Sequence, residues 1–179
     1  MEDGFLQSSY AREIMEFHCP RYDELPGIDL YMDQVLCVIE EALSAFSLGE
    51  KMLTSSMVNN YVKQKIVSPP VNKKYSRKHL AYLMVVCILK KVFSISEICR
   101  MITIQMENHP LESTYDLFCQ ETEQALRMAF TGEAMAEIEE KKEERELLRS
   151  AVLSFAQKVW AQKYLEYRLE KDHSLEKEG

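Results

Sequence analysis

The 179-residue sequence has little of the two residues that most often interrupt helices. It contains only five glycines and five prolines. Leu, Ile, Met, Glu, Lys and Ala are frequent instead, and these residues favour helix over sheet. We therefore predict an all-α fold and do not expect an extended β-sheet domain.

A long apolar run is also lacking. No stretch approaches the roughly 20 consecutive apolar residues that a membrane-spanning helix needs. The start, MEDGFLQSS, does not show the basic and then apolar pattern of a secretory signal. Because 46% of the residues are hydrophobic, wholesale disorder is not expected either. These observations favour a folded, cytoplasmic protein.

Motifs for metal binding and catalysis are missing as well. The five cysteines form no CxxC pair, and no histidine lies at metal-ligand spacing. His18, His79 and His109 accompany no recognisable Ser or Cys nucleophile motif, and there is no glycine loop to cradle a phosphate. We expect neither a metal, nor another cofactor, nor enzyme activity. The odd set of cysteines is interpreted as reduced, mostly buried thiols.

Acidic residues are absent from one segment of an otherwise acidic chain. The sequence has 22 Lys and Arg against 29 Asp and Glu, a net charge of −7. Residues 51–96 contain no Asp or Glu, whereas nine basic residues fall there: Lys51, Lys63, Lys65, Lys73, Lys74, Arg77, Lys78, Lys90 and Lys91. This division favours one surface that binds a polyanion. The alternative is a solvated lysine face that balances acidic neighbours through weak surface pairs.

The acid-free segment is predicted to form a helix, a small β wing and a second helix. Thr54 can cap a helix over 55–64. Residues three and four apart share one side of a helix, so its outer face would carry Ser55, Ser56, Asn59, Asn60 and Lys63. Residues 66–67 and 73–75 are predicted to pair as the wing around Pro69 and Pro70. Ser76 then begins a helix that runs to about residue 92.

Helical patterns also flank this segment. They predict helices at 5–18, 29–47, 94–109, 114–130 and 133–171. Ser94 and Glu97 have the spacing of a capping box. Ser113 and Asp116 repeat a weaker form of this signal before the helix at 114–130, and Gly132 can end that helix. We divide the chain into residues 1–110, with a winged core at 51–105, and a C-terminal helical region at 111–179 for dimerisation or sensing.

The last predicted helix carries two apolar rows in its second half. One row is Leu148, Val152, Phe155 and Val159, and the other is Leu153, Ala156, Trp160, Tyr164 and Tyr167. Two rows exceed what one neighbouring helix normally buries. The helix is therefore either the last helix of one core or a surface that pairs with a second copy.

The order of these parts is similar to that in the DNA-binding domain of the MerR family of bacterial regulators. The resemblance covers LTSSMVNNYVKQKIVSPPVNKKYSRKHLAYLMVVCILKKVFSISEI, which would contain a recognition helix, a proline turn, a wing, a long helix and a capped SISEI helix. The chain resembles still more closely an uncharacterised family of Firmicute proteins that carry this MerR-like segment within an all-helical domain of unknown function. SSMVNNYVK and NKKYSRKHLAYL carry that likeness. The resemblance implies a winged helix-turn-helix and a homodimer through long C-terminal helices.

The resemblance also implies which residues contact DNA. MerR-like recognition helices usually read Arg-Tyr-Tyr where this chain has Asn59, Asn60 and Tyr61, and Lys65 replaces the usual glycine before the wing. Lys73 matches the wing arginine, and Tyr75 matches the second wing tyrosine. For Tyr61 and Tyr75, however, core packing is favoured over stacking on a base. The predicted DNA-binding residues are Ser55, Ser56, Asn59, Asn60, Lys63, Lys65, Asn72, Lys73, Lys74, Tyr75 and Arg77.

Two hypotheses about function follow. In the first, the protein is a MerR-like transcriptional regulator that binds double-stranded DNA through the helix at 55–64 and the basic wing at 66–75. Lys63, Lys73, Lys74 and Arg77 would contact phosphates, and Ser56, Asn59 and Asn60 would contact base edges. In the second, the winged helix has lost DNA binding and the protein is a helical adaptor for an acidic partner protein. The replaced arginine motivates the second hypothesis.

Overall fold

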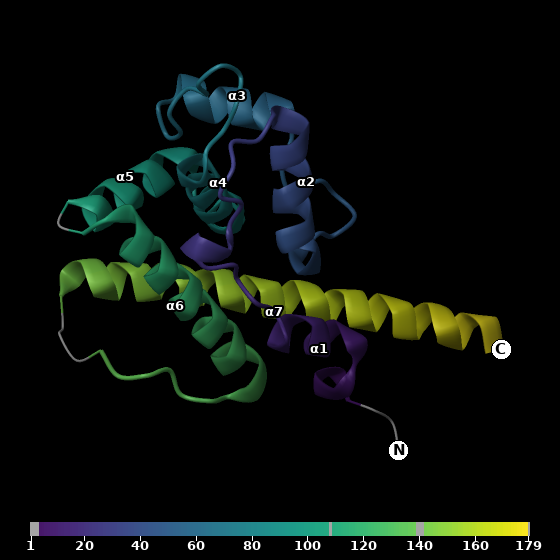
Figure 1. Cartoon of the computed structure of the whole chain (residues 1–179). Coiled ribbons are helices and arrows are strands. Elements are labelled where there is room, and N and C mark those ends of the chain that lie inside the picture. Colours follow the sequence, from purple (N-terminus) through teal and green to yellow (C-terminus); the bar gives the residue numbers. More distant parts are fainter. Residues whose placement is uncertain (1–3, 108, 139–141, 179) are drawn as a thin grey trace.

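The secondary structure is helical, as the composition predicts. The computed structural model describes residues 4–107, 109–138 and 142–178, with side chains to residue 173. Within these residues there are seven α-helices and no strand: α1 (Ser9–Met15), α2 (Met32–Ala42), α3 (Ser55–Lys63), α4 (Arg77–Leu89), α5 (Ile95–Met106), α6 (Leu111–Thr131) and α7 (Glu143–Glu178). Figure 1 shows the long α7 crossing the molecule, with α3 at one end and α1 on the other side of α7.

Helix α4 is the centre of the core. It packs against α2, α5, α6 and α7. Leu80, Leu83, Met84, Cys87 and Ile88, the stripe predicted to face inward, are all buried. Apolar residues also occupy much of the rest of its circumference, since a helix with neighbours on every side has little exposed surface for polar groups.

Helices α6 and α7 pack along one another and enclose a buried carboxylate. The Glu121 side chain of α6 is 2% exposed and accepts hydrogen bonds from Arg145 at 2.6 Å and from Arg149 at 2.8 and 2.9 Å. Burial alone raises the pKa of a carboxyl group, but these two guanidinium groups outweigh it and lower the pKa of Glu121. The interaction of Glu121 with Arg145 and Arg149 therefore joins α6 and α7 by charge, in addition to their apolar packing.

Both apolar rows of α7 contact other parts of the chain: the first row is buried, and the second is half-buried except for the buried Ala156. Phe155 lies 5.1 Å from the ring of Phe46, centroid to centroid. Phe5, from the N-terminal segment, lies 5.6 Å from Trp160 and 5.3 Å from Tyr164. The second row thus has a partner within the chain, the N-terminal segment. The homodimer stays a prediction.

Several predicted helices are shorter than expected. The first is reduced to α1 because a 3-10 turn at Phe5–Gln7 precedes it, and Ser8 caps it. Asp29 does not cap the second, because the chain first pairs Leu30 with Tyr75 and α2 begins after Tyr31.

The last predicted helix also begins later than expected. Residues 133–138 and 142, predicted to be helical, are not. Gly132, with φ 77°, ends α6 as expected, and the chain continues without helical structure through residue 138. The predicted helical residues 108 and 139–141 lie outside the described residues.

The start of α6 also differs from the prediction. The helix begins after Pro110 rather than near Ser113. Ser113 donates a hydrogen bond to the carbonyl oxygen of Pro110 at 3.1 Å, and Asp116 accepts one from the backbone N–H of Tyr22 at 2.7 Å. Proline is tolerated at a helix start, and the two polar residues therefore have other roles than a cap. The capping box of Ser94 and Glu97, in contrast, is confirmed.

The cysteines are free, as predicted. Cys19, Cys87 and Cys119 are buried, Cys99 is half-buried, and Cys37 is exposed. The buried cluster of apolar side chains extends from Phe5 to Val159 and thus across residue 110. None of the helices in the described part of the chain has both the length and the apolar character needed to span a bilayer.

Candidate nucleic-acid interface

Helix α3 presents the outer face that its sequence predicts. The hydroxyl of Thr54 caps it by accepting a hydrogen bond from the N–H of Met57 at 3.3 Å. Val58 and Tyr61 are buried against the core. The exposed side chains of the helix and its end are Ser55, Ser56, Asn59, Asn60, Lys63, Gln64 and Lys65. These are hydrogen-bonding and cationic groups without a carboxylate among them.

The end of α3 turns through a left-handed lysine. Lys65 has φ 60°, a conformation that favours glycine, and its side chain is exposed. The N–H of Lys65 donates to the carbonyl of Val62 and that of Ile66 to Tyr61, both at 3.0 Å, which is the Schellman pattern of a helix end. The resemblance placed a glycine here, and the backbone conformation is the one glycine adopts. A cation therefore occupies a strained backbone position beside the exposed face of α3.

The expected wing is a single tight turn. Val71 and Lys74 exchange backbone hydrogen bonds of 3.0 and 2.9 Å, and the two residues between them, Asn72 and Lys73, have φ 51° and 63°. Positive φ at both central residues is typical of a type I′ hairpin turn. Val71, Asn72 and Lys73 are exposed at its tip.

The strand pairing predicted for the wing is wrong. Residues 66–67 do not pair with 73–75; instead the N–H groups of Ile66 and Val67 bond back to Tyr61 at the end of α3. Tyr75 exchanges two backbone hydrogen bonds with Leu30, at 2.9 and 2.8 Å. The loop before α2 therefore supplies the partner. Because the N–H groups of Ile66 and Val67 already donate to the end of α3, they cannot form the hydrogen bonds of a β-ladder.

Three predicted contact residues are not fully exposed: Lys74 and Arg77 are half-buried, and Tyr75 is buried, in line with the core packing favoured for it. Tyr75 is buried, with its ring against His79, and burial raises the pKa of its hydroxyl. Arg77 is half-buried. Its guanidinium pairs with Asp23 at 3.2 Å and lies 5.6 Å from the ring centre of Tyr22. Arg77 therefore already has an anionic partner in the free protein.

The remaining basic residues of the segment divide into structural and exposed ones. Lys90 donates to the backbone carbonyl of Met52, and Lys91 donates to that of Phe46 at 2.9 Å. These two cations bind the loop before α3. Lys51 and Lys78 are exposed, like Lys63, Lys65 and Lys73, whereas Lys74 is half-buried. Figure 1 shows α3 and the loop that follows it at the same end of the molecule, away from α7.

Sequence reasoning missed two residues that hold the hairpin in place. Lys74 lies 5.0 Å from the ring centre of Tyr31, a cation–π contact. His79 is buried and accepts a hydrogen bond from the N–H of Ser76 at 2.9 Å, while its other ring nitrogen lies 3.1 Å from the hydroxyl of Ser68. The spacing of Ser76 and His79, cap position and third helical position, was the available signal for His79. No local pattern indicated Tyr31.

Comparison with known proteins gives a family without an assigned activity. Residues 20–118 match the family described as a domain of unknown function, DUF1836. The match begins before α2, ends within α6 and includes the whole candidate interface. Neither a curated protein nor a solved structure matches the chain. The expected likeness to an uncharacterised domain family is thus confirmed.

Proposed function

The chain belongs to the DUF1836 family, and we propose that it binds double-stranded DNA through α3 and the adjoining hairpin. One observation carries the proposal. The acid-free exposed face of α3 continues into Lys65, a cation held in a left-handed backbone conformation that glycine would adopt at less cost. The order α2, α3, hairpin, α4 and α5 also agrees with a MerR-like helix-turn-helix whose wing is reduced to a turn.

The side chains divide into two roles. Lys63, Lys65 and Lys73 are exposed lysines that would neutralise phosphates and fix the protein on the duplex. Asn59 and Asn60 lie on the face of α3 that would enter the major groove, where an amide can bond both N6 and N7 of adenine. Phosphate contacts supply affinity and base contacts supply preference. A transcriptional role would follow from such preference.

The test is a titration of labelled duplex DNA at two ionic strengths. Fluorescence anisotropy should show binding at low salt that weakens steeply as salt increases, because each neutralised phosphate releases condensed counterions. A Lys63→Gln/Lys73→Gln variant should reduce the slope of log K against log salt by about 2. Absence of binding even at the lower salt concentration would contradict the proposal.

A matched control separates this interface from net charge. Arg12 lies in α1 and Arg168 in α7, and both side chains are exposed. Figure 1 places α1 on the side of α7 away from α3. Arg12→Gln/Arg168→Gln changes the net charge by the same amount as the lysine variant. It should leave the salt slope unchanged.

A second candidate function is adaptor binding to an acidic protein segment. The observation that favours it is the engagement of Arg77 by Asp23, because Arg77 is the one arginine within residues 51–96. An acidic peptide should then bind more tightly than duplex DNA of equal charge at the same salt concentration. Competition between a poly-Glu peptide and the duplex for the same labelled protein distinguishes the two functions. Displacement of the peptide by DNA favours the first.

A further inference from the structure

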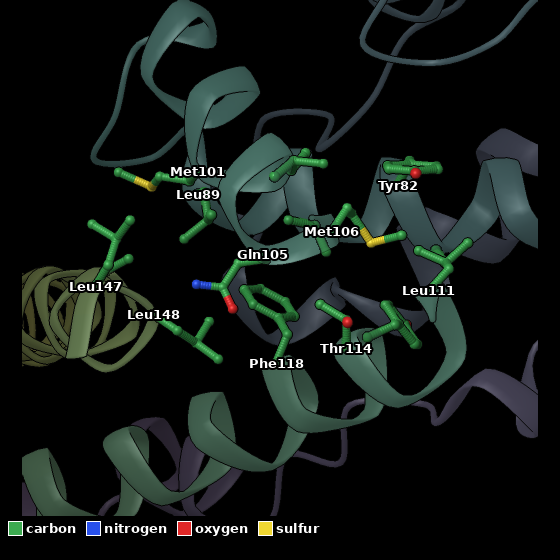
Figure 2. A pocket seen from close by; sticks show the side chains of 15 residues that line it. Tyr82, Leu89, Met101, Gln105, Met106, Leu111, Thr114, Phe118, Leu147 and Leu148 are labelled. Atoms are coloured by element: carbon green, nitrogen blue, oxygen red, sulfur yellow. The ribbon is translucent and has the colours of Figure 1, made fainter. Parts of the chain in front are cut away.

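An apolar cavity, partly open to solvent, lies where four helices meet. Its volume is about 50 Å³, and α4, α5, α6 and α7 all contribute to its wall. Figure 2 shows Leu89, Met101, Met106, Phe118 and Leu148 directed around it. The side chains that line it are mainly aliphatic, aromatic or thioether groups.

Three polar residues in the wall, Gln105, Thr114 and Tyr115, have partners outside the cavity. The side-chain amide of Gln105 donates to the backbone carbonyl of Glu144. The hydroxyl of Thr114 donates to Pro110 and that of Tyr115 to Pro20, both at 2.9 Å. A buried water needs two to four polar partners, and an apolar cavity stays dry. The wall therefore favours an uncharged apolar occupant.

Helix α5 is the part of the wall that we expect to move, because it is less buried than α4 and α6. Ile98 is the one buried side chain among the twelve described residues of α5, whereas α4 and α6 are extensively buried. Its cavity-facing residues Met101 and Met106 are half-buried. Methionine has three rotatable bonds and adapts its shape to irregular contacts. A shift of these two side chains enlarges the cavity without disturbing the buried helices.

From this arrangement we infer that the cavity binds a small uncharged apolar molecule, about the size of a substituted benzene. A dry cavity of about 150 Å³ holds benzene, so the observed volume requires Met101 and Met106 to move aside. No charged side chain lines the cavity within the described residues. A carboxylate or ammonium group on the ligand would therefore be desolvated without a counter-charge.

The ligand site adjoins the end of α3. Tyr82, Ile102 and Met106 line the cavity and also a surface groove that contains Lys65 and Ile66. A molecule that displaces Met106 therefore acts on the groove that contains the left-handed turn beside the DNA-facing surface. Ligand occupancy should change DNA affinity, and this step rests on the proposed function.

The binding claim is tested by NMR on protein with ¹³C-labelled methionine methyl groups. Toluene should shift the Met101 and Met106 signals in a saturable manner, whereas Met15 and Met128, which do not line the cavity, should remain unchanged. Benzoate, of similar size but charged, should shift none of them. Absence of selective shifts up to the solubility of toluene would overturn the inference.

Two cavity variants and one control variant are compared, so that the test does not depend on the folding of a single variant. Ala151→Leu fills the cavity and should abolish the toluene shifts. Met101→Ala enlarges it and should tighten toluene binding at least fivefold, whereas Met128→Ala on the outer side of α6 should not. Unchanged affinity in Met101→Ala contradicts the site even if Ala151→Leu does not fold.

The link to DNA is measured separately. Duplex titrations with and without saturating toluene should differ at least threefold in affinity. If the DNA affinities are equal but toluene shifts the methionine methyl signals, the effect of the ligand on DNA binding is overturned and the ligand site itself is retained. If the free protein binds no DNA at any salt concentration, the proposed function fails while the methyl titration still decides the ligand site.

Discussion

At the scale of single residues, the left-handed lysine at the end of α3 is the observation on which the proposed DNA binding depends most. A non-glycine residue at positive φ costs of order 1–3 kcal/mol. The Schellman bonds of Ile66 and Lys65 hold it there. The sequence showed a lysine where the MerR pattern that the segment resembles has glycine, but only the backbone showed that it adopts the glycine conformation.

Replacing Lys65 by glycine should separate stability from binding. Lys65→Gly relieves the positive φ, so the free energy of unfolding should rise by about 1 kcal/mol. DNA affinity should fall at the same time, since one exposed cation is lost. Urea denaturation and anisotropy on the same preparation measure both quantities. Loss of stability together with unchanged affinity would assign Lys65 a structural role instead.

Asn59 should determine base preference rather than general affinity. Asn59→Ala removes a side chain that can bond an adenine edge, and a good bidentate contact discriminates by about 1–3 kcal/mol. Affinity for a selected binding sequence should therefore fall towards that for random duplex, with an unchanged salt slope. The matched control is Gln120→Ala, which removes an exposed amide from α6 and should change neither affinity. An equal loss on selected and random DNA in Asn59→Ala would contradict this role.

At the scale of helices, buried charge joins α6 to its neighbours. Besides Glu121, the Glu123 side chain of α6 accepts hydrogen bonds from Arg21 at 2.8 and 2.9 Å and from the N–H of Cys19 at 2.8 Å. One carboxylate thus faces α7 and the other faces the N-terminal loop. The helical pattern did not indicate either pair, because the partners lie far away in the chain.

Neutralising Glu121 should destabilise the α6–α7 pair. Glu121→Gln leaves Arg145 and Arg149 near a neutral group, and removal of one partner from a buried ion pair costs about 3–5 kcal/mol. Glu112→Gln, on the exposed side of the same helix, is the control and should change stability little. Thermal and urea unfolding provide the comparison. Similar effects of the two substitutions would show that the Glu121 pair contributes no more than a surface charge.

The same two carboxylates should make the protein sensitive to acid. Burial raises the pKa of Glu121 and Glu123, but hydrogen bonds from arginine reverse this effect and lower both below the usual 4.5. Their stabilisation is therefore present above about pH 4.5 and is lost as the pH falls through the lowered folded-state pKa values. The free energy of unfolding of Glu121→Gln/Glu123→Gln should depend less on pH in this range than that of the unaltered protein. Equal pH dependence would contradict the assignment.

At the scale of the whole molecule, the segment of α3, the hairpin and α4 depends on helices outside the family match. Phe46 packs on Phe155 of α7, and α4 contacts both α6 and α7. A fragment of residues 20–118 lacks α7 and most of α6, so its core would be exposed. Its thermal unfolding should show no cooperative transition, whereas the full chain should unfold in one. A cooperative fragment with a midpoint near that of the full chain would show that the segment folds independently.

The sequence by itself determined the helical composition, the acid-free segment, the caps at Thr54 and Ser94, and the outer face of α3. These features depend on residues three or four positions apart, so a local pattern is sufficient to predict them. The tertiary structure alone decided which cations remain exposed, since Asp23 engages Arg77 and distant carbonyls bind Lys90 and Lys91. It also decided that Leu30 pairs with Tyr75 and that four helices enclose the cavity. Those outcomes depend on which distant segments pack together, and periodicity carries no information about that choice.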